Sequence, residues 1–515
     1  MNFPIPHPWR EKLQQLWALL WHQADAPSAS FHIGCRWFIA TVSLSFGIAF
    51  LSLWLQLDGL FGAHGLSPIR DLMFHARMTA GAQQVLMNPT LFWLDTSDGL
   101  LHAVCGLGVI FSIATGIGWI RGPGLLLLWA GYLSFCSVGA PFLNFQWDNL
   151  LLEAGLISVF LISWRSWKPV HPVFHPLVRW LGVYLLFRLM LASGIVKLSS
   201  GDPVWASLAA LDYHFFTQPL PAPPAWWMHQ LPELLRVLST AGMFVIELLI
   251  PFCFFLPRRL RLLGAGTTTL LQIAIMLTGN YGFFNLLTIG LCCLLIDDAA
   301  WATLSRGWMK YQETSIFKRV HASRMIWHGS VLAFTFTILG MTTVQWFGVF
   351  RLAAPLPEAL KPLYAIVSGS RSINSYGLFA TMTTHRSELI IEGSNDGITW
   401  KTYRFPWKPD AVEDGLPLVA PHMPRVDWQL WFAALTPPQS ARNRWLQRFC
   451  GKLLVGNPQV LGLLEENPFP ESPPQWIRIR AAEFTFTNRS ERQESGNVWK
   501  AGPDRIYWPP MQLTD

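Results

Sequence analysis

The chain has 515 residues, of which 51% are hydrophobic and only 13% are charged. Soluble domains carry about twice that share of charged residues, so the composition excludes an ordinary soluble protein and indicates a multi-pass membrane protein. The formal net charge is +7, but no basic patch interleaved with aromatic residues accompanies it in the sequence. We therefore expect membrane lipid as a partner and no nucleic acid.

The first predicted element is an amphipathic arm over residues 1–32, which begins MNFPIPHPWREKLQQLWALLWHQ. Charged and apolar residues alternate along it, as is typical of a helix that lies on a membrane surface. It has no small-residue cleavage site, so we expect no cleaved signal peptide and an uncleaved first span.

Apolar runs long enough to cross a bilayer recur throughout residues 33–350. They predict a polytopic α-helical bundle of about nine spans. The runs lie at 33–57, 100–120, 122–139, 149–164, 177–199, 236–256, 260–280, 283–300 and 326–350.

Lys and Arg are concentrated in alternate loops. Arg10, Arg121, Arg165, Arg258 and Arg306 mark the basic loops, whereas 140–149 and 201–235 contain no Lys or Arg. The positive-inside rule places the N-terminus in the cytoplasm, and an odd number of spans places everything after residue 350 on the other side. That side is the periplasm for a bacterial inner membrane or the lumen for an endoplasmic reticulum membrane.

The composition changes at about residue 355, where long apolar runs stop. SELIIEGSNDGITWKTYRFPWKP alternates like a β-hairpin with an Asn-Asp-Gly turn, and QWIRIRAAEFTFTNRS predicts two further strand segments. DWQLWFAAL and RNRWLQRFCGKLLVG between them are typical of helices. Residues 355–515 are therefore expected to form a soluble, non-cytoplasmic β-rich domain, sandwich-like with helical insertions.

Several stretches together resemble the lipase maturation factor family. They are FQWDNLLLEAG, LFRLMLASGIVKLSSGDPVWASLAALDYHFFTQPLPAP, ELLIPF, TGNYGFFNLLTI, NSYGLFATMTTHRSELIIEGSNDG, PRVDWQLWFAAL and ENPFPESPPQWIRIR. The resemblance implies a multi-pass membrane maturation factor, a chaperone for secreted or exported lipase-like clients bound on the non-cytoplasmic side. A bacterial member of the family is one interpretation. The sequence has no P-loop and no GxGxxG motif in a suitable context, so no cofactor is expected.

SGIVKLSSGDPVWASLAALDYHF is also similar to the vitamin K-dependent carboxylase group and its horizontally transferred transmembrane domains. That likeness implies a lysine base, which falls on Lys197, and His214 is a candidate proton relay. The alternative function is an integral-membrane enzyme acting on a lipid-soluble or protein substrate. Lys197 is equally explained as a snorkelling interfacial lysine, and no GxSxG motif of a typical lipase is present.

Two acids in FLNFQWDNLLLEAG are candidates for a polar site at the external mouth of the bundle. Asp148 precedes an apolar run, so it either caps that helix or takes part in binding. Glu153 lies inside the run, where a carboxylate needs a partner or becomes neutral. Arg188 in the next span is the candidate partner, and the pair is either a buried structural link or part of a site.

Other polar residues near the external ends of the spans complete this cluster: Asp212, Tyr213, Glu247, Asn280, Tyr281 and Asn285. Asp212 and Tyr213 lie in a segment predicted to be a re-entrant or interfacial helix that ends at Pro219. Glu247 is mid-span. Asn280 belongs to GNYGFFN, which either lines a cavity or makes a tight external turn.

The helix containing Arg425, Asp427 and Trp428 is rich in Trp. An exposed helix of this kind is a candidate client-binding surface, although packing on the domain or at the membrane explains it equally well. The Cys and His spacing matches no metal motif, so no metal is expected.

Overall fold

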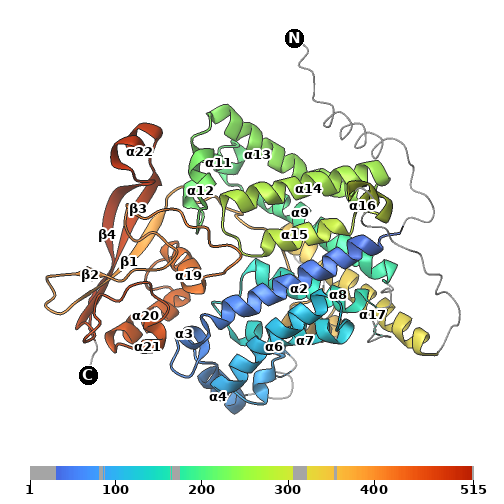
Figure 1. Cartoon of the computed structure of the whole chain (residues 1–515), viewed down its shortest axis with the longest axis horizontal. Helices are drawn as coiled ribbons and strands as arrows, with labels where there is room; N and C mark the ends of the chain where they lie inside the picture. Colours follow the sequence, from blue (N-terminus) through green and yellow to red (C-terminus); the bar gives the residue numbers. More distant parts are fainter. Residues whose placement is uncertain are drawn as a thin grey trace, which may run out of the picture.

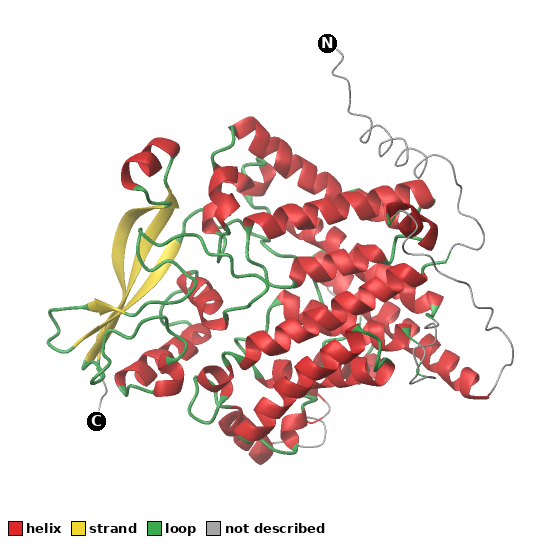
Figure 2. Cartoon of the chain, in the orientation of Figure 1, coloured by secondary structure: helices red, strands yellow, loops and turns green. Residues whose placement is uncertain are grey.

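The computed structural model describes residues 30–79, 85, 87–162, 164, 174–305, 322–352 and 356–512. Apart from Ser30, Phe31 and His32, the predicted amphipathic arm lies outside the described residues, as does most of the loop that contains Arg306. Figures 1 and 2 show the rest as a bundle of helices with a strand-containing part at one end.

Each predicted apolar run coincides with a helix or a pair of helices. They are α2 (His32–Trp54), α6 (Asp98–Gly116), α7 (Gly122–Val138), α8 (Gln146–Leu161), α9 (Pro176–Ser199), α13 (Glu233–Leu248) with η2 (Ile250–Phe255), α14 (Arg258–Thr278), α15 (Phe284–Cys293) with α16 (Asp298–Leu304), and α17 (Ala322–Val349). Among the described residues, six are long and apolar enough to cross a membrane, or seven if α15 and α16, bent by 112°, make one span. The predicted total of nine is not confirmed.

Helix length explains why fewer than nine helices qualify as membrane spans. The 24 residues of α9 extend about 36 Å, which exceeds a hydrocarbon core of about 30 Å, whereas the 16 residues of α8 extend only about 24 Å. Most of α8 is buried, including Leu150, Leu151 and Leu152. It is an internal helix whose surroundings are protein, and this is why it tolerates two acids.

Short helices fill the loops at the end of the bundle near the strands. α3 (Leu57–Phe61), α4 (Ile69–Thr79) and η1 (Leu91–Trp93) follow α2. The segment predicted to be one re-entrant or interfacial helix consists of three: α10 (Pro203–Ala206), α11 (Ala210–Thr217) and α12 (Pro223–His229). The second of these ends just before Pro219, where the sequence indicated a stop.

The C-terminal part contains one four-stranded antiparallel sheet with the order β2-β1-β3-β4. The strands are β1 (Ser387–Ser394), β2 (Lys401–Thr402), β3 (Trp476–Phe486) and β4 (Trp499–Met511). The predicted hairpin is present as β1 and β2, but the two expected segments in 475–490 form the single strand β3. In the described residues no second sheet packs on this one, so the arrangement differs from the expected sandwich.

Helices take the place of a second sheet. α19 (Arg425–Ala434) and α20 (Arg444–Leu454) form where the sequence predicted them, and η3 (Glu358–Leu360), α18 (Lys361–Gly369), η4 (Ala441–Asn443), α21 (Pro458–Leu461) and α22 (Arg489–Ser495) complete the part. β4 was not predicted, because Gly502 and three prolines interrupt its alternation. An edge strand tolerates prolines, since its outer N–H groups need no partner strand.

The C-terminal part and the bundle share one hydrophobic core. Trp428 of α19 makes an edge contact with Trp147 of α8, with 4.6 Å between ring centroids. Trp445 of α20 contacts Phe142 in the same way at 5.4 Å. Aromatic pairs of this kind add to the burial of apolar area, so the two parts are packed as one body.

Candidate functional site

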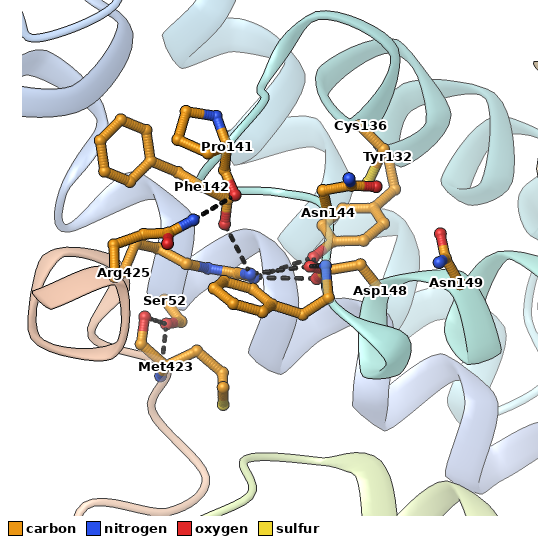
Figure 3. Close-up of polar contacts among 12 residues, drawn as sticks. Ser52, Tyr132, Cys136, Pro141, Phe142, Asn144, Asp148, Asn149, Met423 and Arg425 are labelled. Atoms are coloured by element: carbon orange, nitrogen blue, oxygen red, sulfur yellow. Dashed lines mark hydrogen bonds and ion pairs between the residues drawn. The ribbon is translucent and has the colours of Figure 1, made fainter. Parts of the chain in front are cut away.

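An ion pair between Asp148 and Arg425 joins the bundle to the C-terminal part (Figure 3). Arg425 donates from Nη1 to Asp148 Oδ2 at 2.8 Å and from Nη2 to Asp148 Oδ1 at 2.9 Å. Tyr132 donates its hydroxyl to Asp148 Oδ1 at 2.6 Å, and the Phe142 carbonyl accepts from Arg425 Nη1 at 3.1 Å. This bidentate pairing provides hydrogen-bond partners for both oxygens of Asp148, whose side chain is fully buried.

The position of Asp148 corrects the interpretation of this residue as the N-cap of its helix. Phe145 is the N-cap of α8, and Asp148 lies within the first turn, where its Oδ2 accepts the Phe145 N–H at 3.3 Å. One capping bond is therefore present. The carboxylate mainly binds Arg425, a residue far away in the sequence, which no local capping rule could identify.

Glu153 pairs with Arg188, as the sequence indicated. Its other oxygen accepts from Tyr376 Oη at 2.7 Å and from Asn374 Nδ2 at 3.1 Å. Arg188 Nη1 in turn donates to the Asn374 carbonyl at 3.2 Å. Both charged side chains are almost completely buried, so the second acid of α8 also joins bundle and C-terminal part.

Two arginines that sequence reasoning missed extend this interface. Arg371 donates to the side-chain oxygens of Asn144 at 3.0 Å and Asn149 at 2.7 Å, and to the Cys136 carbonyl at 2.9 Å. Its partners cover the end of α7 and the start of α8. Nothing in the sequence around Arg371 indicates that it binds the loop between α7 and α8.

Arg386 binds the end of α11. Its guanidinium donates to the carbonyls of Phe216 at 2.9 Å, Pro219 at 2.9 Å and Gln218. A cation at a helix C-terminus interacts favourably with the unpaired carbonyls there. Burial lowers the pKa of Arg386, and Glu388 beside it opposes that effect. The sequence analysis used the stretch NSYGLFATMTTHRSEL, which contains Arg386, only as part of a family resemblance and assigned no role to the arginine.

Asn280 joins the loop between α14 and α15 to the C-terminal part. Its side-chain nitrogen donates to the carbonyls of Leu220 at 3.1 Å and Pro417 at 3.0 Å, and its oxygen accepts from the N–H groups of Val419 at 2.9 Å and Ala420 at 3.0 Å. This residue therefore makes a tight inter-part contact.

Gly282 in the same loop has a φ of +59°, and a Cβ there would lie 1.9 Å from Met423 Sδ. Backbone conformation and close approach both favour glycine.

Lys197 pairs with Glu247 across α9 and α13. Lys197 Nζ lies 2.8 Å from Glu247 Oε2 and 2.9 Å from Oε1, and it also donates to the Ser193 carbonyl at 3.2 Å. Its side chain is only 7% exposed, so it does not snorkel to an open surface. Lys197 and Glu247, which were separate candidates in the sequence, thus form one unit.

His214 and Tyr281 come together through a different set of contacts. The Tyr281 hydroxyl donates to Gln218 Oε1 at 2.8 Å and lies 3.3 Å from His214 Nε2. Burial lowers the pKa of His214 to about 4, and the nearby Lys197 ammonium acts in the same direction. His214 is therefore neutral at physiological pH, stacked edge-on against Phe379.

The other predicted polar residues are used in local links. Asp212 pairs with Arg236 at 2.5 Å, and Tyr213 packs as a partly buried apolar group. Asn285 Nδ2 donates to Gln272 Oε1 at 2.7 Å, which connects α15 to α14. Polar pairs of this kind commonly join helices inside a membrane.

Arg425, Asp427 and Trp428 do not form an exposed surface, which corrects their interpretation as a client-binding face. They are 1%, 4% and 3% exposed, respectively, because α19 is enclosed between the bundle and the sheet. Asp427 Oδ1 accepts the N–H groups of Trp407 at 3.1 Å and Lys408 at 3.0 Å. Burial raises the pKa of Asp427 to about 7, although those N–H groups oppose it.

The acids singled out in the sequence are used in contacts within the chain. Asp148, Glu153 and Glu247 each have their own cation, and each cation also donates to at least one backbone carbonyl. Among the described residues, no group of three or more His, Cys, Asp or Glu side chains is placed to hold a metal ion. Arg188, Thr342 and Asn374 are among the residues that line a small cavity.

Comparison with known proteins gives a consistent result over almost the whole chain. Residues 34–303 match the lipase maturation factor transmembrane domain, and residues 372–509 match the lipase maturation factor C-terminal domain. Lipase maturation factor 2 of Homo sapiens is 33% identical over 93% of this chain and 82% of its own length. Lipase maturation factor 1 of Mus musculus is 31% identical over 96% of this chain and 90% of its own length. No solved structure matches the chain significantly.

Proposed function

The chain belongs to the lipase maturation factor family, and from that premise we propose that it is a membrane-embedded maturation and folding factor for secreted or exported lipases. The observation that carries this proposal is the match to both parts of the family, the bundle and the C-terminal part together. A match to one part alone would support only a shared architecture.

We propose that the C-terminal part lies on the non-cytoplasmic side and that the client binds there. The alternation of Lys and Arg between the loops supports this, together with an odd total of seven spans in which α15 and α16 count as one. The half-buried Arg371 and the buried Arg386 and Arg425 link that part to the bundle. A client released into this compartment would meet a rigid surface at a fixed height above the membrane. Because α19 is enclosed, client contacts are expected on other faces of the C-terminal part.

Co-expression with a secreted lipase tests the proposal. In cells that lack their own lipase maturation factors, the chain is expected to raise the secreted lipase activity per unit of lipase mRNA. A secreted protein that folds without help serves as the specificity control, and its yield should not change. Unchanged lipase activity, with the chain present at normal levels in the membrane, would contradict the proposed function.

Lys197→Arg separates this function from the membrane-enzyme alternative. Arginine keeps a cation beside Glu247 but does not give up its proton, so it cannot act as a base. If Lys197 only pairs with Glu247, lipase maturation by the variant should stay within about twofold of wild type. Lys197→Met, which leaves Glu247 unpaired, should lower the amount of folded protein. Loss of activity in Lys197→Arg at normal protein level would favour the enzyme.

A further inference from the structure

Two short helices at the end of the bundle that carries the C-terminal part expose apolar side chains, although neither is a candidate span. On α4, Phe74 and Met78 are 62% and 76% exposed. On α18, Leu363 and Ile366 are 39% and 41% exposed, and Leu94 after η1 is 83% exposed. We propose that these five residues form an interfacial collar, which inserts into the headgroup layer of the adjacent membrane leaflet.

The apolar row on α18 requires a surface to cover it. Leu363 and Ile366 lie three residues apart and are neighbours on the helix surface, next to Tyr364 and Val367, which pack against the protein core. The helix has nine residues and none of them is buried. Isolated helices shorter than about 12 residues are marginal in water, so an apolar environment on the outer face would stabilise this one.

α4 has the same two-sided character. Ile69 and Met73, one turn apart, are buried in the core, while Phe74 and Met78, also one turn apart, point outward. Arg70 flanks them in the sequence as an exposed cation. An outward apolar pair next to a basic side chain suits the boundary between acyl chains and headgroups, where the cation reaches the polar layer.

Hydrogen bonds fix the collar at the level where the spans end. The Thr90 hydroxyl donates to the Ser134 carbonyl at 3.1 Å and the Ser137 hydroxyl to the Pro89 carbonyl at 2.9 Å, both near the end of α7. Gln345, near the end of α17, donates to the Tyr364 hydroxyl at 2.9 Å.

The segments of the collar are also neighbours of one another. A Cβ on Gly369, the last residue of α18, would lie 2.3 Å from the Met87 carbonyl, in the segment between α4 and η1. Phe350 and Leu352, exposed just after α17, continue the apolar surface from that candidate span towards α18. Since the outer faces of the spans contact lipid, this continuity points to the bilayer as the occupant.

Fluorescence quenching by lipid tests the collar in the full chain. Phe74, Leu363 and Ile366 are replaced one at a time by Cys and labelled with a polarity-sensitive fluorophore. The background chain has Ala at the half-buried positions of Cys253 and Cys293. Each variant is placed in phosphatidylcholine nanodiscs with or without acyl chains brominated near the headgroup. Leu270, 67% exposed on α14, is the lipid-facing reference, and Ile398 and Ile506, 83% and 53% exposed, are matched controls on the C-terminal part.

We expect bromination to remove a share of the collar fluorescence comparable to that lost at Leu270, and to leave Ile398 and Ile506 unchanged. Collar signals no more quenched than Ile506 would overturn the proposal. So would collar labels that ignore bromination but become shielded from aqueous iodide when a purified lipase is added, since this identifies a client surface. Three positions on two helices are read separately, so the misfolding of one variant leaves the test intact.

Discussion

At the scale of single residues, the buried charges of this protein are paired over long sequence distances. Asp148 and Arg425 are both almost fully buried, and each bonds further to Tyr132. Removing one member of such a pair costs more than the pair contributes, because the remaining charge is left without water or a partner. The identity of each member is therefore constrained by the other.

Arg425→Met is expected to lower the free energy of unfolding by about 3–5 kcal/mol, since it strands Asp148. Lys500→Met, at an exposed pair with Glu491, is the matched control and should have a much smaller effect, because solvent screens the exposed pair. Denaturant unfolding in mild detergent measures both. Adding Asp148→Asn to Arg425→Met should recover part of the loss, because the amide is neutral and still accepts from Tyr132. Equal losses in the two single variants would refute a central role for this pair.

Asp427 makes stability depend on pH in the direction opposite to that of a salt-bridged acid. Its pKa is raised from 3.8 to about 7, so the folded state keeps a proton that the unfolded state releases. The contribution of Asp427 to the free energy of unfolding is therefore fully present below pH 3.8 and is lost as the pH rises towards 7. Asp427→Asn should remove this loss, because its side-chain oxygen can still accept from Trp407 and Lys408.

The measurement is the unfolding midpoint of wild type and Asp427→Asn from about pH 5 to about pH 8. The variant should gain relative to wild type as the pH rises through this window. Burial also raises the pKa of the nearby Asp410. Because both chains contain Asp410, the difference between their unfolding midpoints reports on Asp427 alone. Parallel profiles would show that the carboxyl does not titrate in this range.

At the scale of elements, loops of the bundle and of the C-terminal part complete one another's hydrogen bonds. Ser52, near the end of α2, accepts the Met423 N–H at 2.9 Å, and Gln56 accepts the Arg425 N–H at 2.8 Å. These are backbone groups just before and at the start of α19, where a helix has unpaired N–H groups. The bundle thus supplies the capping partners that the local sequence of α19 lacks.

Asn280→Ala is expected to loosen the segment that contains Val419 and Ala420, because their N–H groups lose their acceptor. The bond of the Val419 N–H is buried, and an unsatisfied buried donor costs about 1–3 kcal/mol. Hydrogen exchange at these two amides should become faster, while Asn467→Ala, which affects only its own loop at Phe469, should leave them unchanged. Unaltered exchange at 419–420 would mean that other contacts hold the segment.

At the scale of the whole molecule, the bundle and the C-terminal part behave as one folding body. They share a hydrophobic core, and the charged groups of each find partners in the other. Either part alone would expose aromatic side chains such as Trp147 and Trp428 and leave buried charges without partners. The collar proposed above would add the membrane surface as a third contributor.

A chain expressed as two pieces, divided between residues 352 and 356, should therefore reassociate and copurify from detergent. The C-terminal piece alone should aggregate. Arg425→Met in the C-terminal piece should lower the recovered complex strongly, and Lys500→Met should not. A C-terminal piece that stays monomeric and soluble by itself, with the same circular dichroism, would show that it folds independently.

The sequence by itself determined the membrane class, the position of each apolar helix, the β1–β2 hairpin, α19 and α20, and the family. These features depend on local composition and periodicity, which the order of residues contains directly. The sequence also predicted the pairing of Glu153 with Arg188, since an acid inside an apolar helix needs a cation and Arg188 lies in the next predicted span. The predicted count of nine spans was not confirmed, because a short buried helix such as α8 has the same apolar composition as a lipid-facing one.

Only the tertiary structure decided which charges meet across long distances. Asp148 with Arg425, Lys197 with Glu247, and Arg386 with the end of α11 depend on how the C-terminal part docks on the bundle. The same docking buried α19, which the sequence allowed to be an exposed client surface. A single sequence specifies that a buried charge must be neutralised, but its partner is chosen by three-dimensional proximity, which no local pattern contains.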